Sequence, residues 1–541
     1  MSKPVVFTGC FFLFLFSLCA LARSEETSVS IQKIIINRKN VFETGSATDK
    51  QFPYSWANKL HIMTQENYIR RELLFREGDP LDPEKIEESE RSLRARPIFR
   101  YVKITPQEAV NGRADVLVET EDVWTTSIHL SYSVAGGKNS YGIGVLEQNF
   151  LGQGKVVGAF LRKNIDRTTR GVSYRDPQFL GSRWDFFTGY GRDQKGREWE
   201  GHLERPYFSS LSRHSEGVSY SDNDDEDRLF AGGEEVATFR HRTRHLRAFA
   251  SYAVVAKKKK TRRLSLIHER EEDLFSDAQG PGAPLLPPDR KINPMLAGFD
   301  YENVRFKKLR GVVTFDRDED INFGSVWGME AGPYNRHFGA TSRGWAGTMM
   351  IGKNFHPLTD HVWFNALKAD GRLEDDKVED GVLRMRSHYF LRNWAPKNTA
   401  SLRGEYVLSR RLDPEDQFLL GGENGLRGYS VRQFSGFNRA LFSLENRRAV
   451  LYDWLHLVSI GWAVFMDTGA VWNKNSAPSL RRFRSDIGGG LRFAPSRSVD
   501  PGLIRVDVAY ALQDNDRSSR FVVNIGADLS FGERRVRKFD Q

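Results

Sequence analysis

Polar and apolar residues alternate at every second position through most of this chain, from Trp124 to Phe531. In residues 458–470 the even positions are large and apolar up to Met466, while the odd positions include Ser459 and Asp467. A two-residue period is that of a β-strand whose two faces meet different surroundings. After residue 22 there is no apolar run of 18 residues, which excludes transmembrane helices. The chain is therefore expected to be mainly β, and about twenty such segments can be counted.

Connection lengths favour a transmembrane antiparallel β-barrel over a soluble β-sandwich, which has the same alternation. Connections after odd-numbered segments are often long and polar, as in 222–235, 276–293, 372–381 and 413–437. Connections after even-numbered segments are mostly short, as in 151–154, 177–182, 356–360 and 395–399. Outer-membrane barrels show this asymmetry, with short periplasmic turns and long external loops. It predicts that 413–437 is an external loop, whereas the long connection 306–319 breaks the pattern.

The first 22 residues have the pattern of a secretion signal. Lys3 precedes an apolar run over 5–18, and Ala20-Leu21-Ala22 is a small-x-small cleavage pattern. The apolar run is shorter than the ~20 residues of a spanning helix, which disfavours an uncleaved anchor. Both cysteines lie inside this segment, so the mature protein is expected to have no disulfide and no cysteine metal site.

The charge balance bears on the expected partners. Lys and Arg number 80 against 70 Asp and Glu, a formal net charge of +10. The basic residues are spread through strand-like segments of a secreted chain, so nucleic acid is not an expected partner. Outer-membrane lipid and lipopolysaccharide, both anionic, are the expected partners of this excess charge.

Residues 28–123 differ from the rest and predict a small α+β domain. We expect a strand at 31–36, a helix over about 54–74, and a second helix that begins at Asp82-Pro83. Strands at 98–105 and 114–120 follow, joined by a hairpin turn at Asn111-Gly112. The barrel then occupies 124–531, and 532–541 form a basic C-terminal tail that we expect to be a solvated extension.

One motif in the predicted external loop 413–437 is unusual for a solvated loop. Leu426-Arg427-Gly428-Tyr429 places an arginine between glycines and beside an aromatic residue. Gly425 and Gly428 allow a tight backbone course, and an arginine inside a barrel must be paired. Alternation places Glu445 and Asp467 on the lumen face of the next two strands. We expect these carboxylates to clamp Arg427 inside the lumen; the alternative is an arginine on a solvated external turn.

The sequence contains no pattern that predicts catalysis. Gly-x-Ser-x-Gly, His-Glu-x-x-His and phosphate-binding loop motifs are absent, and no catalytic residue is assigned. His241 and His245 would lie about 13 Å apart on a strand that rises ~3.3 Å per residue, so they do not predict a metal site. We expect no enzyme, no cofactor and no metal, and a barrel lipase is disfavoured because no nucleophile constellation is present.

Several motifs together resemble the BamA/TamA and two-partner secretion superfamily of outer-membrane proteins. They are the motif at Arg427, Glu-Gln-Asn-Phe-Leu-Gly-Gln-Gly at 147–154, Tyr-Arg-Asp-Pro at 174–177 and Phe-Met-Asp-Thr-Gly at 465–469. The 28–123 segment resembles a POTRA domain. The resemblance implies a barrel of sixteen strands and the same lumen position for Arg427. It also implies that Asn524, Gly526, Leu529 and Phe531 form the terminal-strand signal that the barrel-assembly machinery reads.

The resemblance implies insertion, assembly or translocation of polypeptides at the bacterial outer membrane. The POTRA domain would lie in the periplasm, where an exposed sheet edge could bind a client polypeptide as an added strand. The client would then pass by one of two routes. One is a lateral seam between the first strand, near 125–133, and the last, at 521–531. The other is a lumen gated by the arginine loop. Two alternatives stay open: a two-partner secretion pore for one substrate, and a lipid-handling or structural envelope barrel.

Overall fold

In the computed structural model of the chain, the described residues are 29–41, 59, 61–209, 212–257, 259–281, 286–312, 318–454, 458–473, 479–495, 503–514 and 520–530. The predicted signal segment 1–22, the tail 532–541 and Phe531 lie outside them. No helix within these ranges is long and apolar enough to cross a membrane.

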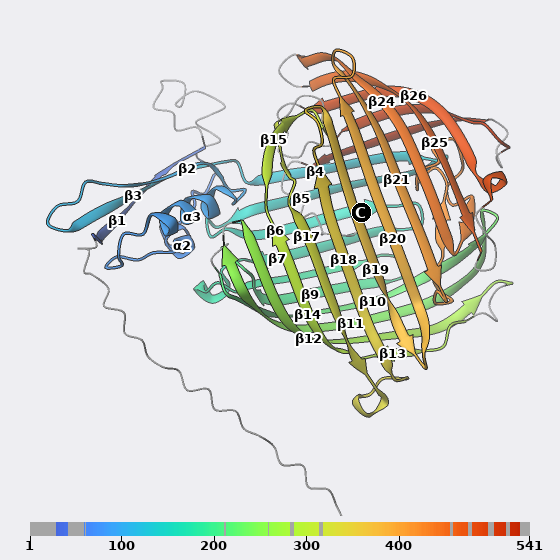
Figure 1. Ribbon diagram of the computed structural model, residues 1–541, viewed down its shortest axis with the longest axis horizontal. Coiled ribbons are helices and arrows are strands. Elements are labelled where there is room, and N and C mark those ends of the chain that lie inside the picture. The colour runs from blue at the N-terminus through green and yellow to red at the C-terminus, as the bar shows by residue number, and fades with distance from the viewer. Residues whose placement is uncertain are drawn as a thin grey trace, which may run out of the picture.

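The N-terminal domain pairs a three-stranded sheet with two helices (Figure 1). Its elements are β1 (Ser30–Lys39), α2 (Glu66–Glu72), α3 (Pro83–Arg94), β2 (Phe99–Pro106) and β3 (Arg113–Asp122). The sheet order is β1-β3-β2, with β1 parallel and β2 antiparallel to β3.

Local sequence explains most of these boundaries. The Asp82 side chain caps α3 by accepting hydrogen bonds from the backbone N–H groups of Glu84 and Lys85. Asn111 and Gly112 both have positive φ, as a tight hairpin turn requires. The first helix is shorter than predicted: 61–65 are not helical and only Glu66–Glu72 forms α2, while most of 54–60 lies outside the described residues. Thr64 is fully buried there and bonds to Asp122, so this segment is held by tertiary contacts.

Residues from Thr126 onward form a closed antiparallel barrel (Figure 1). In the described part of the chain its wall has twenty strands, because the short β13 and the following β14 pair with the same neighbour, β12. The count of about twenty segments is thus confirmed, and the sixteen strands implied by the resemblance are wrong. In its first half the wall consists of β4 (Thr126–Ala135), β5 (Lys138–Phe150), β6 (Lys155–Lys163), β7 (Thr168–Asp176), β8 (Asp185–Arg192), β9 (Arg197–Arg205), β10 (His214–Ala231), β11 (Glu234–Lys257), β12 (Lys260–Gln279), β13 (Arg290–Ile292) and β14 (Met295–Asn303).

The second half of the wall closes the ring back onto β4. It consists of β17 (Ser325–Tyr334), β18 (Gly344–Phe355), β19 (His361–Glu374), β20 (Lys377–Arg392), β21 (Asn398–Arg410), β24 (Asn438–Trp454), β25 (Val458–Trp472), β26 (Arg484–Pro495), β27 (Ile504–Ala511) and β28 (Phe521–Ser530). Two hairpins are not part of the wall: β15 (Phe306–Arg310) with β16 (Asp318–Asn322), and β22 (Phe418–Leu420) with β23 (Phe434–Gly436). Short 3-10 helices occur at Phe179–Gly181, Arg336–Phe338 and Leu480–Arg482.

The alternation read from sequence sorts side chains between the two faces of this wall. On β25, Val464 and Met466 are 50% and 42% exposed on the outer face, whereas Phe465 and Asp467 are 5% and 1% exposed. The outer face is thus apolar and the inner face carries the charged groups, as a membrane barrel requires.

Two of the predicted external loops are strands instead. Residues 222–231 belong to β10 and continue its pairing with β11 up to a turn at Gly232-Gly233. Residues 372–381 likewise form a hairpin with a turn at 375–376. Beyond the apolar band both faces of these strands are polar, so apolar and polar residues no longer alternate. Cross-strand ion pairs, such as Arg242 with Asp222 (2.6 Å), hold the strands together there. The sequence there looks like a loop although the strands continue.

The pairing of the last strand with the first, which we call the seam, closes the barrel. Six residue pairs join β28 to β4, from Ile525 opposite Val134 to Ser530 opposite His129. Six pairs also join β28 to β27 in the described residues, against eighteen between β10 and β11. The last strand is therefore held by short ladders on both of its sides.

Candidate functional site

The connection between β21 and β24, residues 411–437, folds into the barrel; we call it the arginine loop. It contains the β22–β23 hairpin and, between these two strands, the Leu426–Tyr429 motif. Leu426 and Tyr429 are fully buried and pack with Leu420, Leu441 and Ala511. A small apolar core inside the lumen thus fixes the backbone on both sides of Arg427.

The structure brings Arg427 to both carboxylates predicted for it. Its Nε lies 2.6 Å from Asp467 Oδ2 and its Nη2 lies 3.0 Å from Asp467 Oδ1, a two-pronged ion pair. Its Nη1 lies 3.3 Å from Glu445 Oε2. The guanidinium also stacks over the ring of Phe465, 3.3 Å from the centroid.

The network around Arg427 is wider than the sequence predicted. Asp507 on β27 is a third carboxylate, 3.3 Å from Arg427 Nη1 and fully buried. Arg492 on β26 is a second buried arginine, which pairs with Asp507 and lies 3.0 Å from Glu445. The signal for both residues was present, because each lies on the inward positions of an alternating segment. Both residues are far from the motif in sequence, so the sequence alone did not link them to Arg427.

The residues after Arg427 leave no space for larger side chains. Gly428 donates its backbone N–H to Asp486 Oδ2 at 3.0 Å. A Cβ at Gly428 would lie 2.7 Å from Asp486 Cβ and 3.0 Å from the backbone nitrogen of Ala511. The Tyr429 hydroxyl donates to Gln513 Oε1 or to the Ser485 carbonyl, at 2.8 and 3.1 Å.

Asn524 connects the arginine loop to the seam. Its Nδ2 donates to the carbonyl oxygen of Arg427 at 2.8 Å, and its Oδ1 accepts from the backbone N–H of Gly136 at 3.3 Å. Gly136 begins the turn after β4, so this side chain on β28 spans the external end of the seam. Of the other terminal-strand residues, Gly526 and Leu529 lie in the seam ladder, opposite Ser133 and Leu130.

The arginine loop is also tied to the opposite side of the barrel. Arg432 makes a two-pronged ion pair with Asp166 in the β6–β7 connection, at 2.6 and 2.9 Å. Asp413 pairs with Arg290 at 2.9 Å and with Arg372 at 2.8 Å. The loop therefore crosses the lumen near its external end.

The β15–β16 hairpin belongs to the long connection that broke the predicted pattern. It comes from the end of the barrel opposite the arginine loop, and Val312 packs against Val362 and Phe390 of the wall. Arg392 donates to the carbonyl oxygen of Arg310 at 2.8 Å. Next to the arginine loop is a lumen cavity of about 950 Å³, whose lining includes Arg386, Arg403, Arg427 and Arg505. Arg386 on β20 pairs with Glu405 at 2.9 Å.

Two turns of the barrel hold the N-terminal domain; we call 151–154 and 177–184 the docking turns. The backbone N–H of Gln65 donates to the Gly152 carbonyl oxygen at 2.7 Å. Gln178 donates from Nε2 to Glu72 Oε1 at 2.7 Å and to the Tyr68 carbonyl at 3.1 Å. These turns contain or adjoin the motifs at 147–154 and 174–177. The motifs thus lie where the two domains meet.

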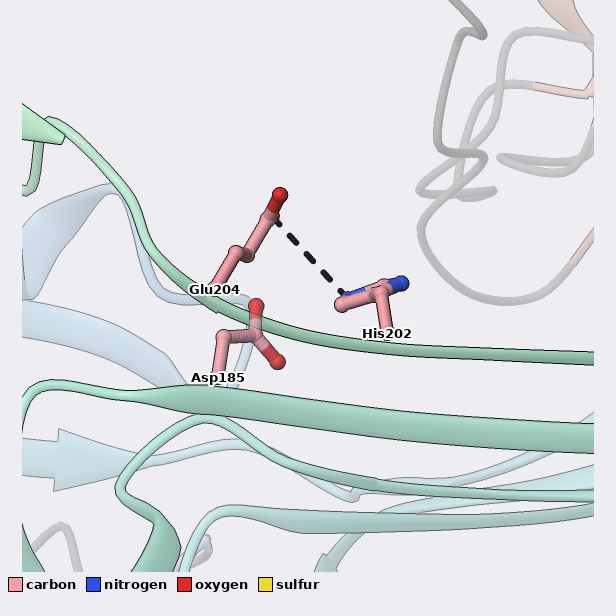
Figure 2. Close-up of side chains that lie close together, drawn as sticks. All are labelled: Asp185, His202 and Glu204. Atoms are coloured by element: carbon pink, nitrogen blue, oxygen red, sulfur yellow. Dashed lines mark ion pairs between the residues drawn. The ribbon is translucent and has the colours of Figure 1, made fainter. Parts of the chain in front are cut away.

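Three potential metal ligands, which no sequence motif predicted, also lie together. Asp185, His202 and Glu204 come from the paired strands β8 and β9, and Figure 2 shows them side by side. His202 lies 4.0 Å from Glu204. Asp185, however, already forms a two-pronged ion pair with Arg175, at 2.8 and 2.5 Å. That guanidinium competes with a cation for the carboxylate, so the cluster is better described as an ion-pair network.

Comparison with known proteins gives two family matches. Residues 386–529 match the Omp85 superfamily domain, and residues 61–130 match the POTRA family described as the surface antigen variable number repeat. No curated protein matches the chain. Similar solved structures include CdiB from Acinetobacter baumannii (13% identity, 93% of this chain and 74% of that chain, TM-score 0.45) and BamA from Haemophilus ducreyi lacking POTRA domains 1-3 (13%, 92% and 85%, TM-score 0.45). CdiB from Escherichia coli is similar to the same degree (12%, 93% and 77%, TM-score 0.44).

Proposed function

The chain carries an Omp85 superfamily domain behind a POTRA domain, and from this premise we propose that it inserts or translocates polypeptides at the bacterial outer membrane. Omp85 proteins are transporters and assembly factors rather than enzymes. The POTRA domain would lie in the periplasm and bind the unfolded client. The barrel would then offer the client its seam or its lumen.

The observation that carries this proposal is the closeness of the POTRA sheet to the seam. The last POTRA strand ends at Asp122 and the first barrel strand begins at Thr126, so a client on the sheet lies next to one side of the seam. The other side is β28, which short ladders hold in place. An edge strand released at such a point is a template for another strand.

The POTRA sheet has one edge suited to strand addition. The outer edge of β1 is occupied: Ile34 donates its N–H to Glu77 at 2.9 Å, and its carbonyl accepts from Arg70 at 2.9 Å. On the β2 edge, Ile104 donates to the Glu90 side chain, but no strand pairs there in the described residues. We therefore assign client binding by β-augmentation to β2.

The arginine loop favours the seam over the lumen as the path. It crosses the barrel and is bonded to two separate parts of the wall, whereas the seam is joined by a short ladder and, at its external end, by the Asn524 side chain. A two-partner secretion pore would need the loop to leave the lumen. We keep that as the second candidate, because the cavity of about 950 Å³ shows that space exists below the loop.

Site-specific photo-crosslinking tests this assignment in living cells. A photoreactive residue at Tyr101, an exposed position on β2, should yield adducts with unfolded polypeptides. The same residue at Lys33, exposed on the covered β1 edge, is the matched control and should yield few. Equal adducts at both positions would contradict binding at the β2 edge. Absence of polypeptide adducts at both would contradict a polypeptide client and favour a lipid-handling role.

A further inference from the structure

A crevice of about 1030 Å³ lies between the POTRA domain and the barrel rim; we call it the rim crevice. One wall is the end of α2 with the following residues 73–79. The other wall is the second docking turn and the connection after β9. Its lining combines apolar side chains, among them Leu74, Trp184 and Phe208, with five arginines. The five arginines are Arg70, Arg71, Arg76, Arg183 and Arg205.

The rim crevice opens on the lipid-facing side of the barrel. On β9, Trp199 is 40% exposed on the outer face beside Tyr190 of β8. Arg205 has the same parity as Trp199, so its side chain also points outward. On β8, Asp185 has the opposite parity to exposed Tyr190 and is buried, so it points inward and the preceding Trp184 belongs to the outer side. The crevice therefore adjoins the outer face of the barrel at the rim that holds the POTRA domain.

Positive charge in the rim crevice is only partly neutralised. Arg70 pairs with Glu66 and Glu77, and Arg205 faces Glu216 at 3.6 Å. Arg71 and Arg76 are exposed, and neither forms an ion pair within the part of the chain that the structure describes. The Arg71 guanidinium lies against Gly181 of the docking turn, so it faces the crevice.

The surroundings of Arg183 show the same excess of positive charge. It donates to the Leu73 carbonyl at 2.8 Å and lies over the Phe208 ring, 4.1 Å from the centroid. Burial lowers the pKa of Arg183, and Arg205 and Arg76 lower it further, against an opposing contribution from Glu72. An anion in the crevice would relieve this repulsion.

The two acidic groups of the lining do not compete for that place. Glu77 is engaged by Ile34 N–H and Arg70. Asp79 accepts from the backbone N–H of Arg76 at 2.9 Å and so fixes the loop that carries this arginine. Both carboxylates are therefore used to hold the POTRA side of the crevice.

We propose that the rim crevice binds the phosphate headgroup of an inner-leaflet phospholipid. Arg71, Arg76 and Arg183 would contact the phosphate oxygens, because guanidinium groups match their geometry. The acyl chains would leave along Trp184 toward the apolar outer face of β8. Such a lipid would join the POTRA domain to the membrane at a fixed place, whether or not a client is bound.

Native mass spectrometry of the full-length protein in detergent tests this proposal. Phosphatidylglycerol is titrated against the wild type, against Arg71→Gln/Arg76→Gln, and against Lys260→Gln/Arg262→Gln. The last pair is the matched control, since both residues lie on the outer face of the same rim at the start of β12, away from the POTRA domain. We expect one lipid retained by the wild type and the control, and affinity at least tenfold weaker in the Arg71/Arg76 variant.

Two further measurements distinguish a bound phospholipid from an acyl chain alone and from free phosphate. Diacylglycerol, which has acyl chains and no phosphate, should not be retained by the wild type. Inorganic phosphate at tenfold excess should not displace the lipid. Equal lipid retention in all three proteins, retention of diacylglycerol, or displacement by inorganic phosphate would each overturn the proposal. No client is present in this assay, so its failure would leave the proposed function untouched.

Discussion

Arg427 shows how a charged side chain is kept inside a membrane barrel. Its guanidinium meets Asp467, Glu445 and Asp507, and Arg492 adds a second positive charge beside Glu445 and Asp507. Burial of one unpaired member would cost several kcal/mol, so the five groups stabilise one another as a unit. The loop conformation and the charges on β24–β27 therefore depend on each other.

Replacing Arg427 by alanine should destabilise the barrel by about 3–5 kcal/mol, because buried Asp467 loses its guanidinium partner and buried Asp507 keeps only Arg492. Heat-modifiability of the folded barrel on SDS gels measures this as a lower unfolding temperature. Arg427→Lys should be intermediate, since a lysine cannot make the two-pronged pair. Arg403→Ala, an exposed lumen position on β21, is the control. Equal unfolding temperatures for Arg427→Ala and wild type would contradict the clamp.

Gly428→Ala tests the close packing of the motif. The added methyl would meet Asp486 and the backbone of Ala511 at 2.7–3.0 Å, so the loop must shift and weaken the contact of Arg427 with Asp467. We expect lower thermal stability and faster proteolysis of the loop. Gly352→Ala is the control, because the nearest atoms there are 3.9 and 4.0 Å away. A Gly428→Ala barrel as resistant as the control would contradict this packing.

At the scale of elements, Asn524 couples the arginine loop to the seam. Asn524→Leu keeps the volume but removes both hydrogen bonds, which contribute ~1–3 kcal/mol when buried partners are left unsatisfied. Hydrogen exchange should then accelerate in β4 and β28 while β10 and β11 stay protected. Acceleration spread evenly over all strands would indicate a general loss of stability and contradict a local role at the seam.

The docking of the POTRA domain should depend on pH through His61. This residue is buried beside Asp122, 3.9 Å from it, with Glu147 and Arg38 near. Burial lowers the pKa of His61 from 6.5, so docking favours neutral His61 and should weaken as the pH falls below that value. Burial raises the pKa of Asp122 and acts in the opposite sense, because docking favours its protonated form.

An Asp122→Asn background isolates the contribution of His61. Hydrogen exchange of 61–73 and 149–154, corrected for its intrinsic pH dependence, should show less protection at pH 5.5 than at pH 7.5. His61→Phe in the same background should abolish this difference. An unchanged difference in that variant would contradict the assignment to His61.

Sequence periodicity predicted the elements best where one strand face meets lipid. The inward positions of Glu445 and Asp467 follow from the two-residue period, and so the partners of Arg427 could be named. Asp507 and Arg492 could not be named as members of the Arg427 network, nor Asn524 as a bridge to the arginine loop, because strand pairing across the wall brings these residues together. The hairpins beyond the membrane were missed for a different reason, since strands with two polar faces look like loops.

At the scale of the whole molecule, the segment count was a better guide than the resemblance. About twenty alternating segments were counted and the described residues form a wall of twenty strands, whereas the family pattern implied sixteen. The resemblance implied the lumen position of Arg427 and a seam between the first and last strands, but it did not predict the docking turns beside the motifs at 147–154 and 174–177. The β15–β16 hairpin and the rim crevice could not be predicted, because both arise from contacts between segments that the sequence leaves far apart.

The proposed insertion of polypeptides can be tested by depletion of the protein in its host, followed by quantitative proteomics of the outer membrane and the medium. We expect loss of several unrelated barrel proteins, restored by the wild type and less fully by Asn524→Leu. Loss of a single secreted protein would instead support the secretion pore. Unchanged protein content in both fractions would contradict a polypeptide client.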